Sequence, residues 1–368
     1  MAIDASGGGR VCFGMIGAGG IARSQHLPNI PRAPHVRLKT ICDLDPAALK
    51  SAQAAYGIPH AVGDAKELLA DPEIVAVIVA TREDAQAPLT IAALKAGKHV
   101  YVEKPLAVTA EAFRTVIKAW EGSGKRVAVG FNRRFAPAYR KVMEVVRACG
   151  GPKNIYYRIS DTYTRGWGRG YPPGSRLYHE VCHVFDVLRW LTGSEAESVY
   201  CVSSRPDDEM LTIRFKSGCV AAVMNSGYGT PDLPKERLEI VGENGGVTVE
   251  EFVEVRTFGR TEFDPVYRFA GHSHPDHDAA HVEEFRTRGA EALYALRRGA
   301  LVNGPDSVPH LNYRVDKGWI ASLDGFAAGI IEGEAQENAT PRDAYAAHLL
   351  ADAAGRSRES GHVERLQE

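Results

Sequence analysis

The sequence lacks the charge imbalance that marks many nucleic-acid-binding proteins. Lys and Arg together number 44 and Asp and Glu 46, so the net charge is close to zero. Proteins that bind nucleic acid usually carry a strongly basic face, and this composition gives no sign of one. We therefore expect a small-molecule partner and no nucleic-acid partner.

Long apolar segments and paired cysteines are also missing. No run approaches the roughly 18 apolar residues of a membrane-spanning helix, and residues 1–10 have no apolar stretch typical of a secretory signal. The six cysteines occur singly, without a C-x-x-C pair, which is typical of buried reduced thiols. These absences predict a cytoplasmic protein with no membrane partner and no metal centre.

The strongest motif lies near the start of the chain. An apolar run, Val11–Ile16, leads into Gly17-Ala18-Gly19-Gly20-Ile21-Ala22, the G-x-G-x-x-A form of the dinucleotide fingerprint. A second apolar run, Val36–Ile41, is followed by Asp43, roughly 20 residues beyond the fingerprint, where an acid is expected. The order of strand, loop, helix, strand and acid predicts a dinucleotide site rather than a Gly-rich surface turn.

Each part of this motif has a physical role. The first glycine permits a tight turn, the second lets the backbone approach a pyrophosphate, and the small Ala22 allows close packing of helix and strand. The N-terminus of the helix offers N–H groups to the phosphates. Asp43 would accept hydrogen bonds from ribose hydroxyls and repel a 2'-phosphate, so we predict NAD rather than NADP.

Strands and helices alternate as far as residue 130. Apolar runs continue at Ile74–Ala80, His99–Val102 and Arg126–Gly130, with helical patterns between them. This alternation predicts an α/β domain, residues 1–130, with a doubly wound parallel Rossmann sheet. Ligands of such sheets bind beyond the carboxyl ends of the strands, where we expect Thr81, Glu103 and the residues after Gly130.

From about residue 150 the pattern changes to short strands in succession. They predict an α+β domain, residues 131–340, with an open, mostly antiparallel sheet that has one face on helices and one free for a partner subunit. We expect one long helix at Tyr178–Leu191 and others at His281–Arg298, Val315–Glu332 and Pro341–Arg356. Residues 341–368 are expected to pack back on the first domain, with a frayed end from Ser357.

Two segments could carry chemistry. Lys104, in Glu103-Lys104-Pro105, follows a predicted strand, and Pro105 restricts its backbone. A cation held there can stabilise an alkoxide as hydride leaves carbon; a solvated loop lysine is the alternative. In a helix, His179, His183, Asp186 and Trp190 share a face. This face is either catalytic, or it meets solvent, or its histidines are satisfied by backbone carbonyls.

His179-Glu180-Val181-Cys182-His183 also spells the H-E-x-x-H motif of zinc hydrolases. The extended form of the motif has Gly and His where this chain has Asp186 and Arg189, so we retain zinc hydrolysis only as the least favoured alternative. Just before the helix, a Gly/Pro-rich loop carries Tyr163, Arg165, Trp167, Arg169 and Tyr171. Aromatic rings and cations suit sugar recognition, although an ordinary packed loop fits equally well.

These motifs together resemble the glucose-fructose oxidoreductase, inositol dehydrogenase and MocA family. The likeness includes the fingerprint, Ala92–Val100 leading into Lys104, Gly130–Phe135 and Cys182–Asp186, and covers the chain to about residue 250 and again from about Asp316. The resemblance implies a Rossmann domain, a second domain whose open sheet usually dimerises, and NAD(P)-dependent chemistry on sugars or cyclitols. It also implies that Lys104 and His183 are the active-site lysine and histidine.

The chain departs from the family pattern at several positions. His179 replaces a common Asp, Thr81-Arg82-Glu83-Asp84 with Gln86 replaces the usual loop, Trp319 stands where His is frequent, and residues 267–312 look inserted. Our catalytic candidates are Lys104, His183 and His179. The cofactor candidates are Gly17, Gly19, Gly20, Ile21, Ala22, Asp43, Thr81, Arg82, Glu103, Lys104 and Asn132. The substrate candidates are Arg133, Tyr163, Arg165, Trp167, Arg169, Tyr178 and Asp186.

Our leading hypothesis is oxidation of a secondary alcohol on a sugar or cyclitol. His183 takes the hydroxyl proton, since an ordinary imidazole pKa near 6.5 suits this transfer at neutral pH, and Lys104 stabilises the alkoxide. One alternative is an enzyme that retains NAD and uses transient oxidation for elimination, glycoside cleavage or epimerisation. Another is a sensor of NAD and sugar without turnover. We expect a homodimer or homotetramer formed through the second sheet.

Overall fold

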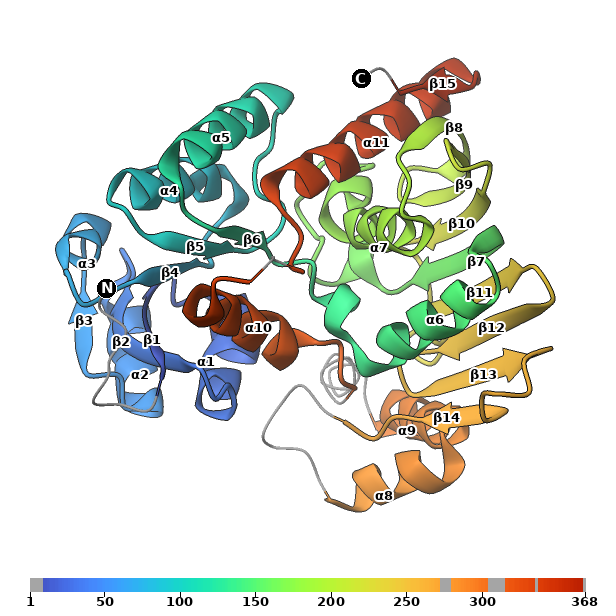
Figure 1. Ribbon diagram of the computed structural model, residues 1–368, viewed down its shortest axis with the longest axis horizontal. Coiled ribbons are helices and arrows are strands. Elements are labelled where there is room, and N and C mark those ends of the chain that lie inside the picture. The colour runs from blue at the N-terminus through green and yellow to red at the C-terminus, as the bar shows by residue number, and fades with distance from the viewer. Residues whose placement is uncertain (1–8, 272–278, 304–314, 335–336, 367–368) are drawn as a thin grey trace. The chain divides into compact units, whose positions relative to one another are not determined.

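A computed structural model describes residues 9–271, 279–303, 315–334 and 337–366 (Figure 1). The chain divides into two compact units. Unit 1 contains Met1–Asn132 and Gly318–Tyr345, and unit 2 contains Arg133–Lys317 and Ala346–Glu368. This division differs from the predicted boundaries, because a segment late in the sequence returns to unit 1 and the last residues belong to unit 2.

Unit 1 is built on a six-stranded sheet in which every neighbouring pair is parallel. The strand order is β3-β2-β1-β4-β5-β6, which confirms the predicted doubly wound Rossmann sheet. The order reverses between β1 and β4, and ligands of such sheets bind at this switch point. The strands are β1 Val11–Ile16, β2 Val36–Cys42, β3 His60–Val62, β4 Ala76–Val79, β5 His99–Val102 and β6 Val127–Val129.

Side chains cap the N-termini of three helices in unit 1. The carboxylate of Asp45 accepts a hydrogen bond from the N–H of Ala47 at the start of α2, and Asp64 and Thr109 cap α3 and α5 in the same way. The elements are the π-helix η1 Ala22–His26, α1 Leu27–Asn29, the 3-10 helix η2 Ile30–Arg32, α2 Pro46–Tyr56, α3 Ala65–Ala70, α4 Glu83–Lys95, α5 Ala110–Ser123 and α10 Trp319–Glu332.

Helix α10 explains why the late segment belongs to unit 1. Phe326 packs against Phe13 and Tyr101 in the core, and the Tyr101 hydroxyl lies 3.0 Å from the hydroxyl of Ser322. Asp324 accepts a hydrogen bond from the backbone N–H of His35. Burial of aromatic side chains on this scale is a major stabilising term, so the sheet needs α10 to complete its core.

Unit 2 contains a nine-stranded sheet in the order β14-β13-β12-β11-β7-β10-β9-β8-β15. Its neighbouring strands are antiparallel except for β7 and β10, which run parallel, so the predicted mostly antiparallel sheet is confirmed. The strands are β7 Pro152–Ser160, β8 Ala196–Arg205, β9 Asp208–Phe215, β10 Val220–Ser226, β11 Glu236–Gly242, β12 Gly245–Glu250, β13 Glu254–Phe258, β14 Val266–Arg268 and β15 Glu364–Arg365.

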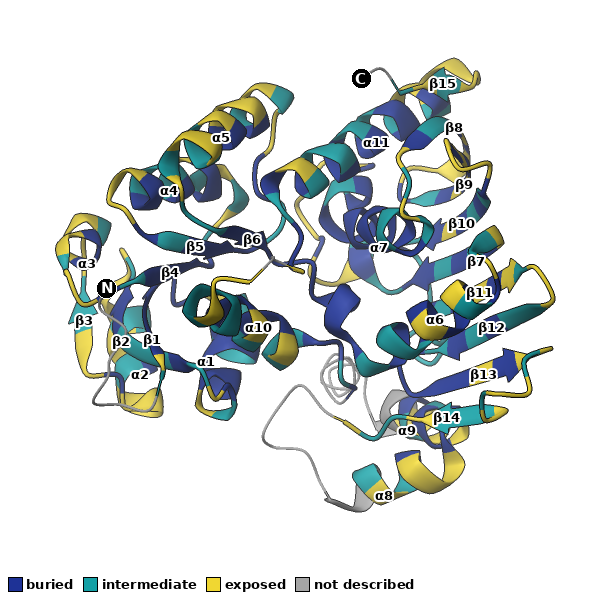
Figure 2. Cartoon of the chain, viewed as in Figure 1, coloured by how far each residue is buried: buried dark blue, intermediate teal, exposed yellow. Residues whose placement is uncertain are grey.

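One face of this sheet carries helices, and on the other face, among the described residues, side chains of β8, β9 and β10 are exposed. Helix α6 contacts β12 and β13, and α7 contacts β7; Figure 2 shows dark, buried residues on these helices and strands. Side chains alternate along β9, where every second residue is buried. The remaining helical elements are the 3-10 helices η3 Asn132–Phe135 and η4 Tyr163–Arg165, α6 Pro137–Ala148, the π-helix η5 Leu177–Val181, α7 Cys182–Thr192, α8 Ala279–Arg288, α9 Ala290–Asn303 and α11 Pro341–Ser360, which begins in unit 1.

Two predictions about the later part of the chain were wrong. The helix expected at His281–Arg298 is two helices, α8 and α9, because Gly289 adopts a left-handed conformation (φ 60°) between them. The end expected to fray from Ser357 instead extends α11 and adds β15, which pairs with β8. The described part of the inserted segment packs on unit 2 through an ion pair between Arg297 and Glu251.

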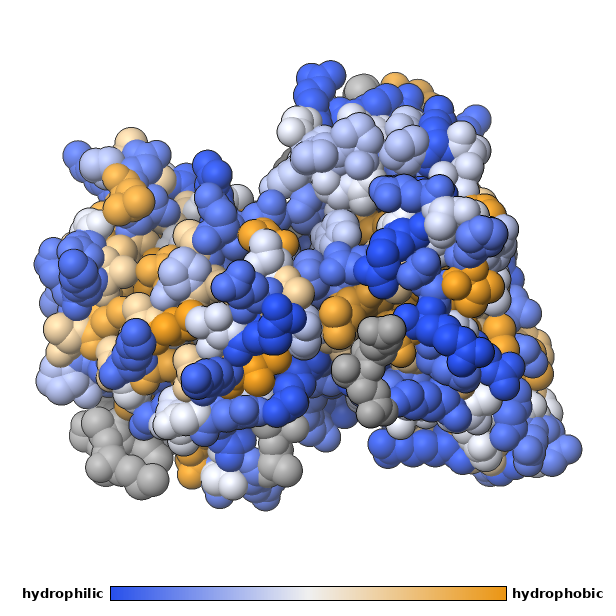
Figure 3. Space-filling view, turned by 90° about the horizontal axis from the view of Figure 1, so that it is seen from above, coloured by the Kyte–Doolittle hydropathy of each residue, from blue (hydrophilic) through white to orange (hydrophobic). Residues whose placement is uncertain are grey.

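The cysteines of the protein are buried, and the face of it drawn in Figure 3 is mostly hydrophilic. All six cysteines are buried, as predicted, and burial raises the pKa of the Cys201 thiol to about 12. Among the described residues, no helix combines the length and apolarity that crossing a bilayer requires. Hydrophilic residues dominate the face drawn in Figure 3, with apolar residues in scattered patches.

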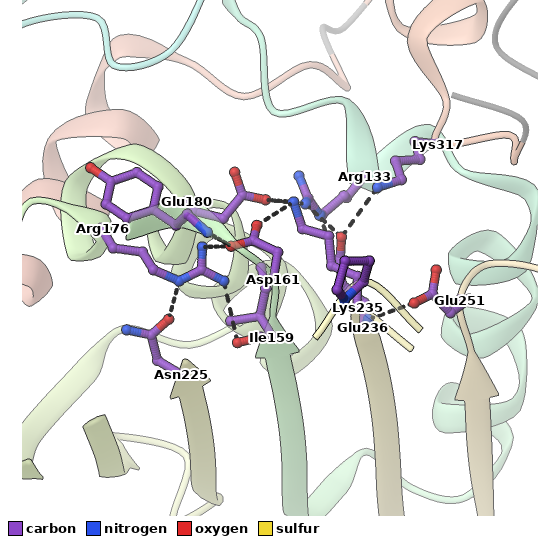
Figure 4. Close-up of polar contacts among 12 residues, drawn as sticks. Arg133, Ile159, Asp161, Arg176, Glu180, Asn225, Lys235, Glu236, Glu251 and Lys317 are labelled. Atoms are coloured by element: carbon purple, nitrogen blue, oxygen red, sulfur yellow. Dashed lines mark hydrogen bonds and ion pairs between the residues drawn. The ribbon is translucent and has the colours of Figure 1, made fainter. Parts of the chain in front are cut away.

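The core of unit 2 holds a pair of opposite charges. Arg133 and Glu236 are both buried, and their side chains form two hydrogen bonds of 2.9 and 2.7 Å (Figure 4). The hydroxyl of Tyr157 donates to the same carboxylate at 2.7 Å, and Lys317 lies 3.5 Å from it. Burial acts to raise the pKa of Glu236, but the charges of Arg133 and Lys317 outweigh it and lower the pKa to about 2.

Removing the charge of Glu236 should destabilise unit 2. In Glu236→Gln, Arg133 keeps its buried charge but loses the carboxylate that binds it through two hydrogen bonds and retains only Glu180, 3.2 Å away, so we expect the free energy of unfolding to fall by about 3 kcal/mol at neutral pH. Urea unfolding followed by circular dichroism measures this. Glu239→Gln, at an exposed position of the same strand, is the control and should change stability by less than about 0.5 kcal/mol.

The same pair sets a pH dependence. Because the folded-state pKa of Glu236 is lower than its ordinary value of 4.5, the stabilisation is fully present above that pH and is lost as the pH falls toward 2. The stability difference between the wild type and Glu236→Gln should shrink over this range. A difference that stays constant down to pH 3 would contradict the assignment.

Candidate functional site

The predicted cofactor residues of unit 1 gather at one edge of its sheet. Gly17 directly follows β1, Glu103 follows β5, and Thr81 and Asn132 lie two and three residues beyond β4 and β6. Since these strands are parallel, their carboxyl ends meet at the same edge. The structure therefore brings together residues that are more than 100 positions apart in the sequence.

The fingerprint loop is shaped by its glycines. Gly17 has a φ of 109°, and a Cβ atom there would lie 2.2 Å from the carbonyl oxygen of Ala80, so only glycine fits. Gly19 differs, because an added Cβ would meet no protein atom within 4 Å. Gly19 and Gly20 are exposed, and the helical conformation begins at Gly20. This open backbone at a helix N-terminus fits the diphosphate of a dinucleotide.

Asp43 is fixed against the same loop. One carboxylate oxygen accepts a hydrogen bond of 2.6 Å from the N–H of Ala18, and the other accepts one from the N–H of Asp45. Arg23 holds the loop from the other side, donating to the carbonyl oxygens of Ala18 and Ala48. Arg23 was not predicted, although its place directly after the fingerprint is a signal that could have identified it. The position of Asp43 fits binding of a ribose.

The backbone of Lys104 is held by a buried acid. One oxygen of Glu103 accepts a hydrogen bond from the N–H of Lys104 at 3.3 Å, and the other lies 2.8 Å from Nε2 of His26. The ring of His26 packs nearly perpendicular to the rings of Tyr101 and Trp319. The role of His26 was missed, because its partner lies 77 residues away and no local pattern connects them.

The loop after β4 is tied to its own helix. The side-chain amide of Gln86 donates to the carbonyl oxygen of Thr81 at 3.4 Å, and Thr81 donates to the carbonyl oxygen of Arg82. The exposed Arg82 pairs with Asp84, 3.1 Å away. Contact between Thr81 or Arg82 and a cofactor stays a prediction.

In unit 2 the two histidines lie on the short π-helix η5, here called the π-turn, and on helix α7, which continues from it. His179 belongs to η5 and His183 to the first turn of α7. A π-turn inserts one extra residue into the helical ladder and is frequent at functional sites. His179, His183 and Asp186 are all buried, and Asp186 binds Arg134 at 2.8 Å. The alternative that this face meets solvent was therefore wrong.

His179 is oriented by a neighbouring tyrosine. Its Nδ1 lies 2.9 Å from the hydroxyl of the buried Tyr163, and its ring packs against Tyr171 with 4.2 Å between centroids. Trp167 completes the aromatic surroundings. An imidazole fixed in this way can exchange a proton or hydrogen-bond a ligand only in a defined direction.

Glu180 ties the π-turn to the rest of unit 2. Its carboxylate lies 3.2 Å from Arg133 and 2.7 Å from Lys235, and Lys235 continues to Asp161 at 3.0 Å (Figure 4). Arg176 binds the other oxygen of Asp161 at 2.9 Å. Burial acts to lower the pKa of Lys235, but Glu180 and Asp161 raise it above its ordinary value, so the ammonium stays charged.

This pairing argues against the zinc hydrolase alternative. In that chemistry the glutamate of H-E-x-x-H activates water, whereas Glu180 is engaged with two buried cations. Sequence reasoning missed Lys235, Glu236 and Arg176, since charged residues near strand ends are usually exposed. A Lys-Glu pair directly before an alternating apolar strand was the available signal.

The predicted substrate residues fall into two groups. Arg133 and Asp186 are buried in ion pairs, and Tyr178 donates to Asp352 at 2.8 Å. Trp167 is 52% exposed, and Arg165 and Arg169 are exposed beside it in the same loop. Substrate contact stays a prediction for all of them, and the geometry favours the exposed group.

Both units of the chain match known protein families. Residues 11–131 match the family described as "Oxidoreductase family, NAD-binding Rossmann fold", and residues 150–366 match "Oxidoreductase family, C-terminal alpha/beta domain". An inositol 2-dehydrogenase from Acidothermus cellulolyticus is 32% identical over 284 residues, which cover 72% of this chain and 80% of that protein.

Solved structures share the fold over nearly the whole chain. A putative myo-inositol dehydrogenase from Sinorhizobium meliloti superposes with a TM-score of 0.73 at 24% identity, covering 97% of this chain and 100% of that one. The WlbA dehydrogenase from Bordetella pertussis, solved with NADH and UDP-GlcNAcA, gives 0.72 at 20% identity and covers 98% of each chain. With the fingerprint edge in unit 1, these matches show that the chain belongs to the Gfo/Idh/MocA family of NAD-binding oxidoreductases.

Proposed function

We propose that the chain oxidises a secondary alcohol of a sugar or cyclitol, with NAD as the hydride acceptor. The observation that carries this proposal is the position of Lys104, two residues beyond β5 at the edge that carries the fingerprint loop, with its backbone held by the buried Glu103. The inositol 2-dehydrogenase relative supports an alcohol as substrate. A cation fixed at a dinucleotide site suits stabilisation of an alkoxide.

The chain's own residues handle the proton and the developing charge. When bound, NAD supplies the acceptor for the hydride that leaves the alcohol carbon. His183 takes the hydroxyl proton, and the ammonium of Lys104 stabilises the negative oxygen as the C–O bond becomes a carbonyl. His179, oriented by Tyr163, hydrogen-bonds the substrate and takes the place of the Asp common in the family.

Asp43 supports NAD rather than NADP. Its carboxylate is held beside the fingerprint loop by the N–H groups of Ala18 and Asp45, so it cannot turn away without losing both bonds. A fixed anion there accepts hydrogen bonds from ribose hydroxyls and repels a 2'-phosphate.

The two glycines of the fingerprint should separate folding from cofactor binding. In Gly19→Ala the new methyl group meets no protein atom within 4 Å, so stability should stay within about 1 kcal/mol while NADH affinity falls at least roughly tenfold, because the backbone can no longer approach the pyrophosphate. In Gly17→Ala the new methyl group would collide with the carbonyl oxygen of Ala80, so the free energy of unfolding should fall by about 1–3 kcal/mol. Fluorescence titration with NADH and thermal unfolding measure the two effects. Equal NADH affinity in Gly19→Ala and the wild type would refute the site.

The proposed chemistry predicts the effect of removing each group. Lys104→Met and His183→Asn should each lower kcat/KM for oxidation of myo-inositol or another active polyol by about 10²–10⁴-fold, and NADH affinity should stay close to that of the wild type in His183→Asn. NADH formation at 340 nm measures the rate. If both groups act on one hydroxyl, the double variant should lose little more than the worse single variant.

Three outcomes would each contradict a different part of this mechanism. Multiplicative losses in the double variant would mean that the two groups act in separate steps. Conversion of substrate without accumulation of NADH would overturn net oxidation in favour of the NAD-retaining alternative. Full activity in both single variants would remove Lys104 and His183 from the mechanism.

We also propose that the open face of the unit 2 sheet pairs with a second copy of the chain. Val202, Met210 and Met224 are neighbours in register on β8, β9 and β10, and each is exposed by more than a third of its surface. A contiguous apolar patch of this kind marks an interaction surface.

A charge in this patch should break the oligomer. Met210→Glu places a carboxylate at its centre, so sedimentation should show half the wild-type mass: one chain where the wild type shows two, or two chains where it shows four. Val302→Glu, at an exposed position of α9, is the control and should leave the assembly intact. A monomeric wild type, or an unchanged mass for Met210→Glu, would contradict the assignment.

A further inference from the structure

The loop between η4 and η5 in unit 2 is anchored at both ends. At its start, the N–H of Thr164 donates to the carbonyl oxygen of Gly227, and Arg165 donates to that of Gly229. At its end, the carboxylate of Asp207 accepts hydrogen bonds from the N–H groups of Gly174 and Arg176 at 3.0 and 2.9 Å. Within the loop, the N–H of Gly168 donates to the carbonyl oxygen of Tyr163, and the N–H of Tyr171 donates to that of Gly168.

The glycine between the two aromatic positions determines how the loop packs. A Cβ atom on Gly168 would lie 2.4 to 2.5 Å from ring atoms of Tyr163, so the loop backbone rests directly on that ring. Trp167 stands at 84° to the same ring with 4.7 Å between centroids. Tyr163 is thus a buried base on which the loop and Trp167 are positioned.

The exposed aromatic side chains converge on His179. The ring centroid of Tyr171 lies 4.2 Å from that of His179, and the centroid of Trp167 lies 6.4 Å from it. Trp167 and Tyr171 are 52% and 43% exposed, while His179 and Tyr163 are 8% and 2% exposed. The cluster therefore buries Tyr163 and His179 and leaves the rings of Trp167 and Tyr171 accessible to a ligand.

We propose that Trp167, Tyr171 and His179 form a platform that binds the C–H face of a six-membered polyol ring. The proposal rests on the polyol oxidation proposed above and narrows its substrate class to cyclic compounds. A pyranose or cyclitol has an apolar C–H face that packs on aromatic rings and hydroxyls at its edge. The imidazole of His179 supplies a polar group beside the rings.

The platform should discriminate against open-chain polyols. A chain of the same carbon number has no preformed C–H face, and it loses the freedom of several rotatable bonds when it is ordered on a surface. A rigid ring loses far less. Stacking therefore favours cyclic polyols over open-chain polyols, independently of the hydrogen bonds that their hydroxyl groups make.

The test compares cyclic and open-chain probes on the full chain with NADH bound. The probes are myo-inositol, methyl β-D-glucopyranoside and D-glucitol, and binding is measured by saturation-transfer difference NMR. We expect at least one cyclic probe to receive saturation at its C–H protons and D-glucitol to receive little. Trp167→Ala should weaken binding of the cyclic probe about tenfold, Tyr171→Ala should weaken it less, and Trp167→Phe should retain most of the affinity.

Controls separate the platform from the fold. Phe258→Ala removes another exposed ring of unit 2 and should leave probe binding unchanged, and NADH affinity should be the same in all variants. In steady-state assays with a cyclic substrate, Trp167→Ala should raise KM with little change in kcat, as expected for loss of uniform binding.

The outcomes distinguish this proposal from the proposed oxidation. If a cyclic probe binds and loses affinity in Trp167→Ala although no NADH forms with any polyol, the platform stands and the oxidation fails. If NADH forms with equal KM in Trp167→Ala and the wild type, the oxidation stands and the platform fails. Binding of D-glucitol as tight as that of the cyclic probes, or of no cyclic probe at all, also overturns the platform.

Discussion

The pairing of Glu180 with Arg133 and Lys235 is the interaction on which the histidine site depends. A buried charge is tolerated only when partners compensate it, and removing one partner leaves the others uncompensated at a cost of several kcal/mol. Glu180 lies on the π-turn, Arg133 precedes α6, and Lys235 precedes β11. These segments therefore stay together, and the turn that carries His179 cannot relax to a regular helix without breaking the network.

Unit 1 uses acids in the same way, to hold backbone at the sheet edge. Asp43 binds the N–H of Ala18, and Glu103 binds the N–H of Lys104 while His26 holds its other oxygen. In each case a carboxylate stabilises the loop that presents a functional group. Preorganisation of this kind removes an ordering cost from ligand binding.

The sequence was sufficient to predict the Rossmann sheet and its functional edge, because both follow from local rules. A fingerprint after an apolar strand gives the first crossover, and parallel strands place Gly17, Glu103 and Asn132 at one edge whatever their spacing. The open second sheet also followed from short strands in succession. The return of α10 to unit 1 did not, because an apolar helix in the sequence does not reveal which sheet it covers.

The sequence could not predict which buried charged or polar side chains pair with one another in either unit, and the reason is different. Arg133 and Glu236 are 103 residues apart, and His26 and Glu103 are 77 apart. No periodicity connects such pairs, and a single string such as H-E-x-x-H fits a zinc site and an ion-pair network equally well. The π-turn was also hidden, because a spacing of 100° per residue assumes a regular helix.

The acid next to position 179 gives a reason for histidine there. The network joins three buried or nearly buried acids, Asp161, Glu180 and Glu236, to four buried cations, Arg133, Arg176, Lys235 and Lys317. Glu180 already supplies a carboxylate to two of these cations, one position after the Asp that the resemblance implies. The imidazole of His179 has its own partner outside the network, the hydroxyl of Tyr163, which lies 2.9 Å from Nδ1. With the acid at position 180 instead, position 179 carries a ring that can join Trp167 and Tyr171.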